Sequence, residues 1–323
     1  MLNSFMSRTI VITGATGFIG SVLARRLAST DWQIRALVRP TSIHKQPNEI
    51  ASEWITGDLE DMGSLRRLVG GAEAVVHCAG AVRGIHQVNF ERTNVDGVAR
   101  LVRAATEQHP KPRFLLISSL AAREPDLSYY AASKRKGEKA LATKSGGMPW
   151  VIFRPPVVYG PGDREMLPLF QWMHRGITPI IGSDKSRISL LYVTDLAEAI
   201  VYWLHRGKRS GCVYELHDGH TGGYMWQDVI DAVARLNGKP IYRAKIPVSF
   251  LKLVASLNLM AARVFGRAPM LTPGKVRELT HPNWVCDNTA LNSDTGWTPK
   301  VTLEEGLRRT LRQSDNVIRT AKF

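Results

Sequence analysis

Cysteine is scarce in this chain of 323 residues. The three that occur, Cys78, Cys212 and Cys286, share no short spacing, so the sequence indicates neither a disulfide framework nor a zinc site. We therefore expect free, mostly buried thiols, no bound metal and a reducing compartment.

A long uninterrupted apolar run is also missing. A membrane-spanning helix needs roughly 18 or more such residues in a row, and no stretch reaches that length. Residues 1–14 have neither the apolar core nor the cleavage pattern of a secretory signal. Because internal repeats are absent as well, we expect a soluble, cytoplasmic, globular protein.

Acidic residues are outnumbered by basic ones. The chain has 43 Lys and Arg against 28 Asp and Glu, and residues 235–323 alone have 15 against 6. Nucleic acids, membrane surfaces and anionic small molecules all attract such charge. No nucleic-acid motif accompanies it, so we predict no nucleic-acid partner and interpret most of the charge as a solvated basic face.

Apolar runs alternate with helix-period segments through the first half, a pattern that builds a parallel sheet covered on both faces. The predicted fold class is α/β: a doubly wound parallel Rossmann sheet with a smaller C-terminal substrate-binding lobe. We assign residues 1–160 to the dinucleotide-binding domain, to which residues 187–217 return, and 161–323 mainly to the lobe. The expected strands are RTIVIT, QIRALVR, ASEWITG, AEAVVHCAG, RFLLISS, WVIFRP, RISLLYV and CVYEL. We expect Thr194 or Asp195 to cap the helix after RISLLYV.

A glycine-rich turn joins the first strand to the first helix. Its glycines permit a tight turn, close approach of backbone N–H groups to a pyrophosphate, and close packing of helix on strand, while the helix N-terminus favours negative charge. The residues that we expect to bind the dinucleotide here are Gly14, Thr16, Gly17, Phe18, Ile19 and Gly20.

The end of the second strand decides between two dinucleotides. An acidic residue there would hold the ribose of NAD, whereas a cation would meet the 2′-phosphate of NADP. The segment QIRALVRPTS has Arg39 and no carboxylate, with Thr41 or Ser42 as helpers. The sequence therefore favours NADP, and NAD stays open.

Two further strand ends lie where open α/β sheets bind their ligands. Asp58 and Leu59 follow the third strand, and Asp58 should face the adenine edge. Ala79 and Gly80 follow the fourth strand. His77 just before them is interpreted as a core histidine without a chemical role.

A tyrosine and a lysine share one helix face. Tyr130 and Lys134 are four residues apart on a predicted helix that begins at about Ser128. The ammonium, together with an oxidised nicotinamide ring, should lower the phenol pKa from its usual value of about 10, which makes Tyr130 an acid/base group near neutral pH. Tyr129 is five residues from Lys134 and should point elsewhere.

Ser119 ends the strand RFLLISS at the carboxyl edge of the sheet. Its hydroxyl can hold the substrate oxygen on which charge develops. Ser118 should face the opposite side of the sheet. A strand-end serine followed by Y-x-x-x-K on a helix, downstream of a glycine turn, indicates redox chemistry at a C–OH/C=O carbon.

The whole motif set resembles the extended short-chain dehydrogenase/reductase superfamily and its NAD-dependent epimerase/dehydratase group. The resemblance implies that Ser119, Tyr130 and Lys134 are catalytic, that Lys134 also holds the nicotinamide ribose, that Asn94 supports the site, and that Pro155 contacts the cofactor. The motifs that carry it are TGATGFIG, GDL, HCAG, TNVDG, ISS, YAASK, RPPVVYGPGD, LLYVTDLAEAI and NTALNSDTGWTPKVTLEEGL.

Departures from the nucleotide-sugar branch of that superfamily narrow the choice. LAAREPDLS joins Ser119 directly to the tyrosine helix, and Val157 stands where that branch usually has an asparagine. RPPVVYGPGD and the second strand that ends in arginine look more like dihydroflavonol-reductase and 3β-hydroxysteroid-dehydrogenase members.

We therefore predict an NADP-dependent dehydrogenase or reductase for a secondary alcohol or ketone of an apolar or lipid-like small molecule. The alternative is a nucleotide-sugar epimerase or dehydratase that uses the same residues with transient hydride transfer. A further alternative is a catalytically silent dinucleotide-binding scaffold, against which the intact catalytic set argues. A homodimer is compatible with the sequence.

Residues 249–265 form an expected helix that is apolar on most of its surface. Only Lys252, Ser256 and Arg263 mark a polar stripe. Core packing is the first interpretation. The surrounding Lys and Arg residues lead us further, to predict that the lobe supplies an apolar wall to the substrate pocket and associates weakly and reversibly with membranes.

Overall fold

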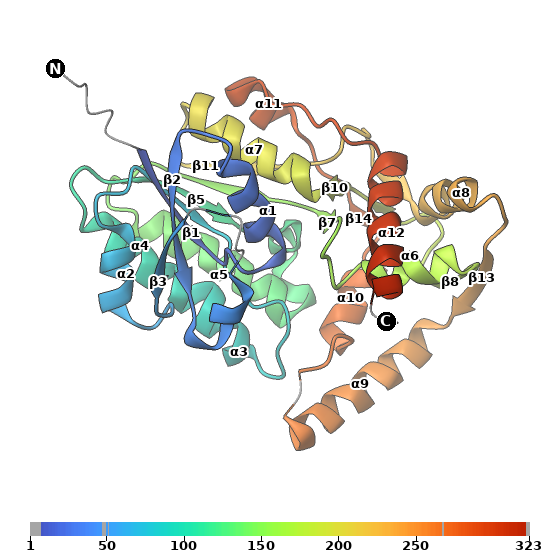
Figure 1. The fold of residues 1–323 in the computed structure, drawn as a ribbon. Coiled ribbons are helices and arrows are strands. Elements are labelled where there is room, and N and C mark those ends of the chain that lie inside the picture. The colour runs from blue at the N-terminus through green and yellow to red at the C-terminus, as the bar shows by residue number, and fades with distance from the viewer. Residues whose placement is uncertain (1–7, 47–49, 51, 267, 321–323) are drawn as a thin grey trace.

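The computed structural model describes residues 8–46, 50, 52–266 and 268–320. A parallel sheet of seven strands forms its centre (Figure 1). From one edge to the other the strands are β11 (Cys212–Glu215), β6 (Trp150–Arg154), β5 (Arg113–Ile117), β4 (Ala74–His77), β1 (Arg8–Thr13), β2 (Trp32–Val38) and β3 (Ser52–Thr56). The chain thus builds the sheet outward from β1 in both directions, and the predicted doubly wound α/β fold is confirmed.

Helices cover both faces of this sheet because successive strand residues point to opposite sides. Ile10 and Ile12 of β1 pack in the same apolar cluster as α1 (Phe18–Leu27) and α7 (Val193–Arg206). Val11 packs in the opposite layer. That layer contains α2 (Met62–Val69), α4 (Val98–Thr106) and α5 (Tyr129–Lys144).

The helix expected after the fourth strand is interrupted by a π-helical turn. α3 (Gln87–Glu91) and α4 are joined by η2 (Arg92–Gly97), which contains Asn94. A Cβ on Gly137 of α5 would lie 2.1 Å from the Asn94 carbonyl oxygen, so a glycine is needed for α5 to lie against this turn. Such π turns are frequent at functional sites.

The smaller lobe is built from the segments after Arg154 and lies beside the carboxyl edge of the sheet (Figure 1). The single strand expected from RISLLYV is wrong, because β9 and β10 belong to two different small sheets. The elements of this lobe are β7 (Val157–Tyr159), α6 (Leu167–His174), β8 (Ile177–Ile181), β9 (Arg187–Ile188), β10 (Leu190–Tyr192), β12 (Tyr224–Met225), α8 (Trp226–Asn237), β13 (Tyr242–Ile246), α9 (Val248–Phe265), α10 (Pro273–Thr280), β14 (Asn283–Trp284) and α12 (Leu303–Thr320). α11 (Thr289–Thr295) instead packs on α7 and β11 beside the central sheet.

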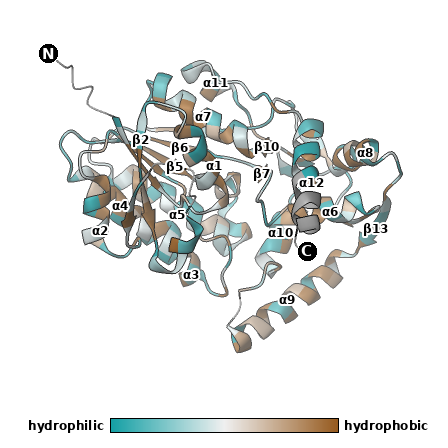
Figure 2. Ribbon diagram, viewed as in Figure 1, coloured by the Kyte–Doolittle hydropathy of each residue, from teal (hydrophilic) through white to brown (hydrophobic). Residues whose placement is uncertain are grey.

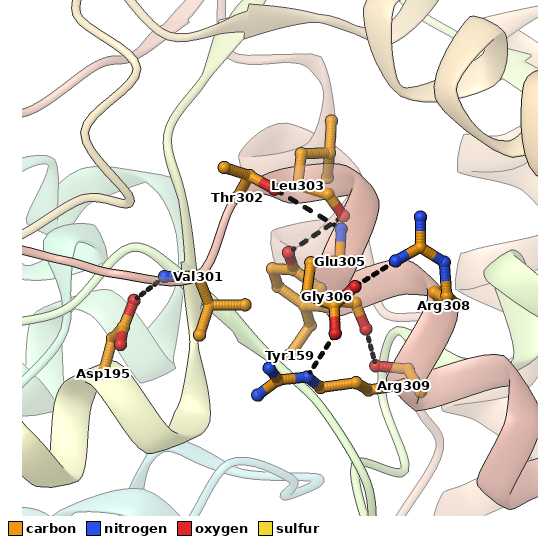
Figure 3. Close-up of polar contacts among 10 residues, drawn as sticks. Tyr159, Asp195, Val301, Thr302, Leu303, Glu305, Gly306, Arg308 and Arg309 are labelled. Atoms are coloured by element: carbon orange, nitrogen blue, oxygen red, sulfur yellow. Dashed lines mark hydrogen bonds and ion pairs between the residues drawn. The ribbon is translucent and has the colours of Figure 1, made fainter.

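The start of α12 is anchored to both halves of the molecule (Figure 3). The expected helix cap at Thr194 or Asp195 is wrong, since α7 begins at Val193. The buried Asp195 carboxylate instead accepts the Val301 N–H at 2.9 Å, just before α12. Gly306 of α12 lies against the Tyr159 ring, where a Cβ would come within 2.3 Å of the hydroxyl oxygen.

Helix α9 lies at the edge of the lobe and is brown over much of its length in Figure 2, the colour of apolar residues. Only Leu251, Ala255 and Ala262 of this helix are buried. The core-packing interpretation of residues 249–265 is therefore wrong. By length and composition α9 is apolar enough to cross a membrane, although just 17% of it is buried in the protein.

Candidate active site

The glycine turn after β1 leaves a backbone cradle. Gly14 has φ +72°, and a Cβ there would lie 2.7 Å from the Ala79 nitrogen. A Cβ on Gly20 would lie 2.2 Å from the Gly14 carbonyl oxygen, so α1 packs directly on the turn. Among the described residues no side chain caps Gly17, where α1 begins. The first backbone N–H groups of α1, those of Phe18 and Ile19, follow Thr16 and Gly17 along the chain. They are therefore available to bind an anion.

Arg39 follows β2 at the start of a short 3₁₀ helix, η1 (Pro40–Lys45), and is exposed. Its guanidinium makes no ion pair with any residue in the described ranges. Thr41 is exposed as well, whereas Ser42 is buried. This position is consistent with a contact to a phosphate, which stays a prediction.

Asp58 and Leu59 stabilise their own turn. The Asp58 carboxylate accepts the N–H groups of Glu60 and Asp61 at 2.7 and 3.1 Å. The Leu59 side chain lies against Gly97, where an added Cβ would come within 2.8 Å. These two hydrogen bonds lie within the protein. The contact of Asp58 with the adenine stays a prediction.

Asn94 clamps the loop that follows β4. Its side-chain oxygen accepts the Ala81 N–H at 2.8 Å, and its amide donates to the Ala81 carbonyl and to the Ser133 hydroxyl, both at 2.9 Å. Gly80 lies between this amide and the Lys134 ammonium. His77 is fully buried, contacts Thr13 through Nδ1 at 2.6 Å, and has its pKa lowered to about 3 by burial. A neutral core histidine matches its interpretation from the sequence.

Lys134 reaches the carboxyl end of β5. Its ammonium donates to the Ile117 carbonyl oxygen at 2.7 Å, and burial lowers its pKa to about 8. The sequence placed Ser118 on the side of the sheet opposite to Ser119, but Ser118 also reaches α5, where it donates to the buried Glu138. Glu138 is paired with Arg154 of β6 at 2.6 Å, and this buried ion pair holds α5 on the sheet.

Ser119 and Tyr130 lie together at the edge of the sheet. Ser119 begins η3 (Leu120–Arg123), and its hydrogen bond with the Tyr130 side chain lowers the phenol pKa. Burial outweighs that effect, so the pKa of Tyr130 is raised overall. The expected lowering by Lys134 is therefore not found: Lys134 instead donates to Ile117. Tyr129 is 53% exposed and points away, as expected.

Pro155 lies next to this pair. It is buried, and its carbonyl oxygen accepts the Leu120 N–H at 2.8 Å. The bond ties the loop after β6 to the serine loop, and thereby keeps both strand ends at the site. Val157 begins β7 two residues further on.

Comparison with known proteins identifies the family. A family model described as the NAD dependent epimerase/dehydratase family matches residues 10–216. The chain belongs to this family. Ceramide reductase from Caulobacter vibrioides is 38% identical to it over 276 residues, which are 85% of each chain. The resemblance to extended short-chain dehydrogenases is thereby confirmed.

A further relative and a solved structure are also similar to this chain, the structure in fold alone. 2-Alkyl-3-oxoalkanoate reductase from Stenotrophomonas maltophilia is 26% identical over 329 residues, 93% of this chain and 97% of the relative. The structure of UDP-glucuronic acid 4-epimerase from Bacillus cereus in complex with NAD has a TM-score of 0.74 at 19% identity, with 96% and 99% of the chains covered. The protein is an NAD-dependent enzyme of the reductase or epimerase type.

The site fits the dinucleotide that this family uses. Gly14 leaves a cradle that any Cβ would fill, and the uncapped start of α1 offers amides to a pyrophosphate. Lys134 has a single hydrogen bond among the described residues, so its ammonium retains donors for ribose hydroxyls. When bound, the nicotinamide would supply or accept the hydride.

The sequence analysis missed the C-terminal side of the site. Glu278 of α10 is buried and accepts a hydrogen bond from Ser128, at the start of the tyrosine helix. Lys275 pairs with Glu278 at 3.1 Å and its charge acts on Tyr130, as does that of Glu165. Their separation in sequence from Tyr130 leaves no local signal for this contact.

A separate hollow of about 430 Å³ lies between α8 and α12. It is lined by polar residues that include Asp231, Arg235 and Glu304. None of the predicted site residues lines it. The candidate active site is therefore the group of residues around Tyr130, and this hollow is separate from it.

Proposed function

We propose that this family member is an NADP-dependent reductase or dehydrogenase that interconverts a ketone and a secondary alcohol on an apolar, lipid-like molecule. The observation that carries the proposal is the neighbourhood of Ser119 and Tyr130 at the sheet edge, where Tyr130 lies on the helix whose Lys134 reaches the end of β5, beside the glycine cradle. These groups sit where open α/β sheets bind their ligands.

Each side chain has a distinct task in that reaction. Ser119 donates a hydrogen bond to the substrate oxygen and holds it as negative charge develops. Tyr130 gives its proton to this oxygen during reduction and takes one during oxidation. Its raised pKa keeps the phenol protonated at neutral pH, which suits the donor role. Lys134 binds the ribose, and Asn94 keeps the loop at Ala81 in place.

Two observations favour an apolar substrate. The relatives named ceramide reductase and 2-alkyl-3-oxoalkanoate reductase both carry names that describe reduction of molecules with alkyl chains. Val157 also offers no hydrogen bond at a position where the nucleotide-sugar branch usually has an asparagine. The Bacillus cereus epimerase, at 19% identity, supports the fold and not the substrate.

NADP is proposed as the preferred dinucleotide because Arg39 is exposed at the end of β2, where a 2′-phosphate would lie. A cytoplasmic location and a homodimer belong to the same proposal. Light scattering of the purified protein would test the dimer.

Turnover assays test the proposed reaction. The purified protein is incubated with NADPH or NADH and ketones of increasing chain length, and in parallel with UDP-glucose and UDP-galactose. We expect oxidation of NADPH that improves with chain length and no conversion of the sugar nucleotides. Interconversion of the UDP-sugars without net cofactor turnover, or tightly retained NAD in the mass spectrum, would instead establish the epimerase alternative.

A further inference from the structure

Helix α9 has two apolar sides, and only one of them is used by the protein. The buried residues Leu251, Ala255 and Ala262 lie on one face and pack with Val276 of α10. Large apolar side chains occupy the opposite face at helical spacing, which makes one continuous exposed stripe. The stripe consists of Phe250 (56% exposed), Leu253 (58%), Leu257 (55%), Met260 (61%) and Val264 (78%).

Positive charge borders this stripe. Lys252 and Arg263 are exposed on the flank between the two apolar faces. Residues 236–277 contain eight Lys and Arg and no Asp or Glu. Two of these cations have acidic partners from outside the segment: Lys245 approaches Asp184 at 3.6 Å in an exposed pair, and Lys275 pairs with Glu278 at 3.1 Å. The region is therefore both apolar and basic, a combination typical of helices that lie on anionic lipid surfaces.

The helix is held along the protein rather than released from it. Its buried residues extend from Leu251 to Ala262, most of the helix length. The strand before it, β13, pairs in parallel with β8, and the helix after it, α10, packs back on α9. Both ends are thus tied to the same lobe, so α9 can lie in a membrane surface but does not cross the membrane.

We propose that α9 docks this enzyme on an anionic membrane surface, with its exposed stripe inserted at the boundary between headgroups and acyl chains. A second copy of the chain suits the stripe less well, because like charges on two such basic regions would repel each other. Lipid phosphates neutralise the same charges. The proposed occupant is therefore the lipid surface.

Docking by α9 would bring the active site close to the membrane. α10 lies between α9 and the catalytic helix, and its Glu278 contacts Ser128 two residues before Tyr130. A Cβ on Gly274 of α10 would lie 2.8 Å from the Ser128 Cβ, so this contact is tight. An apolar substrate would then pass only α9 and α10 on its way from the bilayer to Tyr130.

Vesicle flotation tests the docking with the full-length protein. Phosphatidylcholine vesicles with and without phosphatidylglycerol are compared at low and high salt. We expect binding to the anionic vesicles at low salt and its loss at high salt. The double change Leu257→Asp with Met260→Asp should weaken binding at least about tenfold, because two apolar side chains no longer leave water. No binding of the wild type at low salt would overturn the proposal.

The control is Ile177→Asp, which changes a side chain that is 54% exposed in the same lobe but outside α9. It should float like the wild type. Both variants should keep the wild-type melting temperature and the turnover of a short, water-soluble ketone. If the double variant floats unchanged, or if light scattering shows that it only converts a dimer to a monomer, the proposed lipid contact is wrong. The reduction of ketones in solution would stand in either case.

Discussion

Tyr130 is the proposed proton donor, and phenylalanine differs from it only by the phenol oxygen. The ring of Tyr130 contacts Phe90 edge to face at 6.4 Å, and Tyr130→Phe keeps that contact. We expect a loss of about 10²–10⁴ in kcat, since the proton donor is removed, with dinucleotide affinity near the wild-type value. Steady-state kinetics and a cofactor titration measure the two. A variant with half of the wild-type kcat would show that another group is the acid.

The positive charge of Arg39 should give the protein a preference for NADPH over NADH. A charge-assisted contact with a phosphate contributes about 1.5–3 kcal/mol, which is roughly 10- to 150-fold in affinity. Arg39→Ala should reduce the affinity for NADPH by that factor and leave the affinity for NADH unchanged. Fluorescence titrations with both cofactors measure this. Equal wild-type affinities would make Arg39 an ordinary surface charge.

The buried ammonium of Lys134 should make the free energy of unfolding depend on pH. Burial lowers its pKa from 10.5 to about 8 in the folded protein. Between these two values the unfolded chain binds the extra proton, so this residue makes the folded state more stable as the pH rises. The shift corresponds to at most about 3 kcal/mol. Relative to Lys134→Met, the wild type should therefore gain stability from about pH 7.5 to about pH 10.

Urea unfolding at the two pH values measures that difference. Lys139→Met on the same helix is the control, because the Lys139 side chain is exposed and its ammonium stays in water when the protein folds. It should show no such pH-dependent difference from the wild type. The free energies of unfolding of the wild type and of Lys134→Met are compared at both pH values. A difference that is constant with pH would contradict a buried ammonium at Lys134.

At the scale of elements, the contact between α12 and β7 leaves no room for an added methyl group at Gly306. Gly306 lies against the fully buried Tyr159, whose hydroxyl oxygen would be 2.3 Å from a new Cβ (Figure 3). Gly306→Ala should destabilise the protein by about 1–3 kcal/mol, although alanine is the better helix former, because the ring cannot move freely. Thermal unfolding measures the effect. Gly70→Ala is the control, since its Cβ would meet only ordinary contacts at 3.5 Å. Equal melting temperatures for the two variants would contradict the clash.

The sequence predicts elements well where the signal is local. The glycine turn and the Tyr130 and Lys134 pair depend on spacings of a few residues. The break at Ser189 between β9 and β10 was not predictable, because both strands are apolar and only their partners in different sheets separate them. The exposure of α9 was not predictable either, because a buried core helix and a helix that binds a membrane surface can have the same composition. Lys275 and Glu278 reach the site by tertiary packing alone.

For the whole molecule, the central sheet and its core include β11 and α7, which both follow the predicted boundary near residue 160. One sheet face is covered by α7, whose Ile200 and Trp203 pack with Ile10 and Ile12 of β1. We expect a fragment of residues 1–160 to remain without fixed tertiary structure, because α1 would cover this face alone and the part under α7 would be open to water. Near-ultraviolet circular dichroism and dye binding measure this. A cooperative unfolding transition of the fragment would show that the first half is self-sufficient.

α7 is synthesised long after β1, which affects how the chain folds during translation. A ribosome adds about 5–20 residues per second. About 10–40 seconds therefore pass between the emergence of β1 (Arg8–Thr13) and that of the last turn of α7, which ends at Arg206. During that time the growing chain has strands of which one apolar side is covered by α1 but still lacks α7. We expect nascent chains stalled before residue 193 to be held by chaperones, and those stalled well beyond residue 206 to be released.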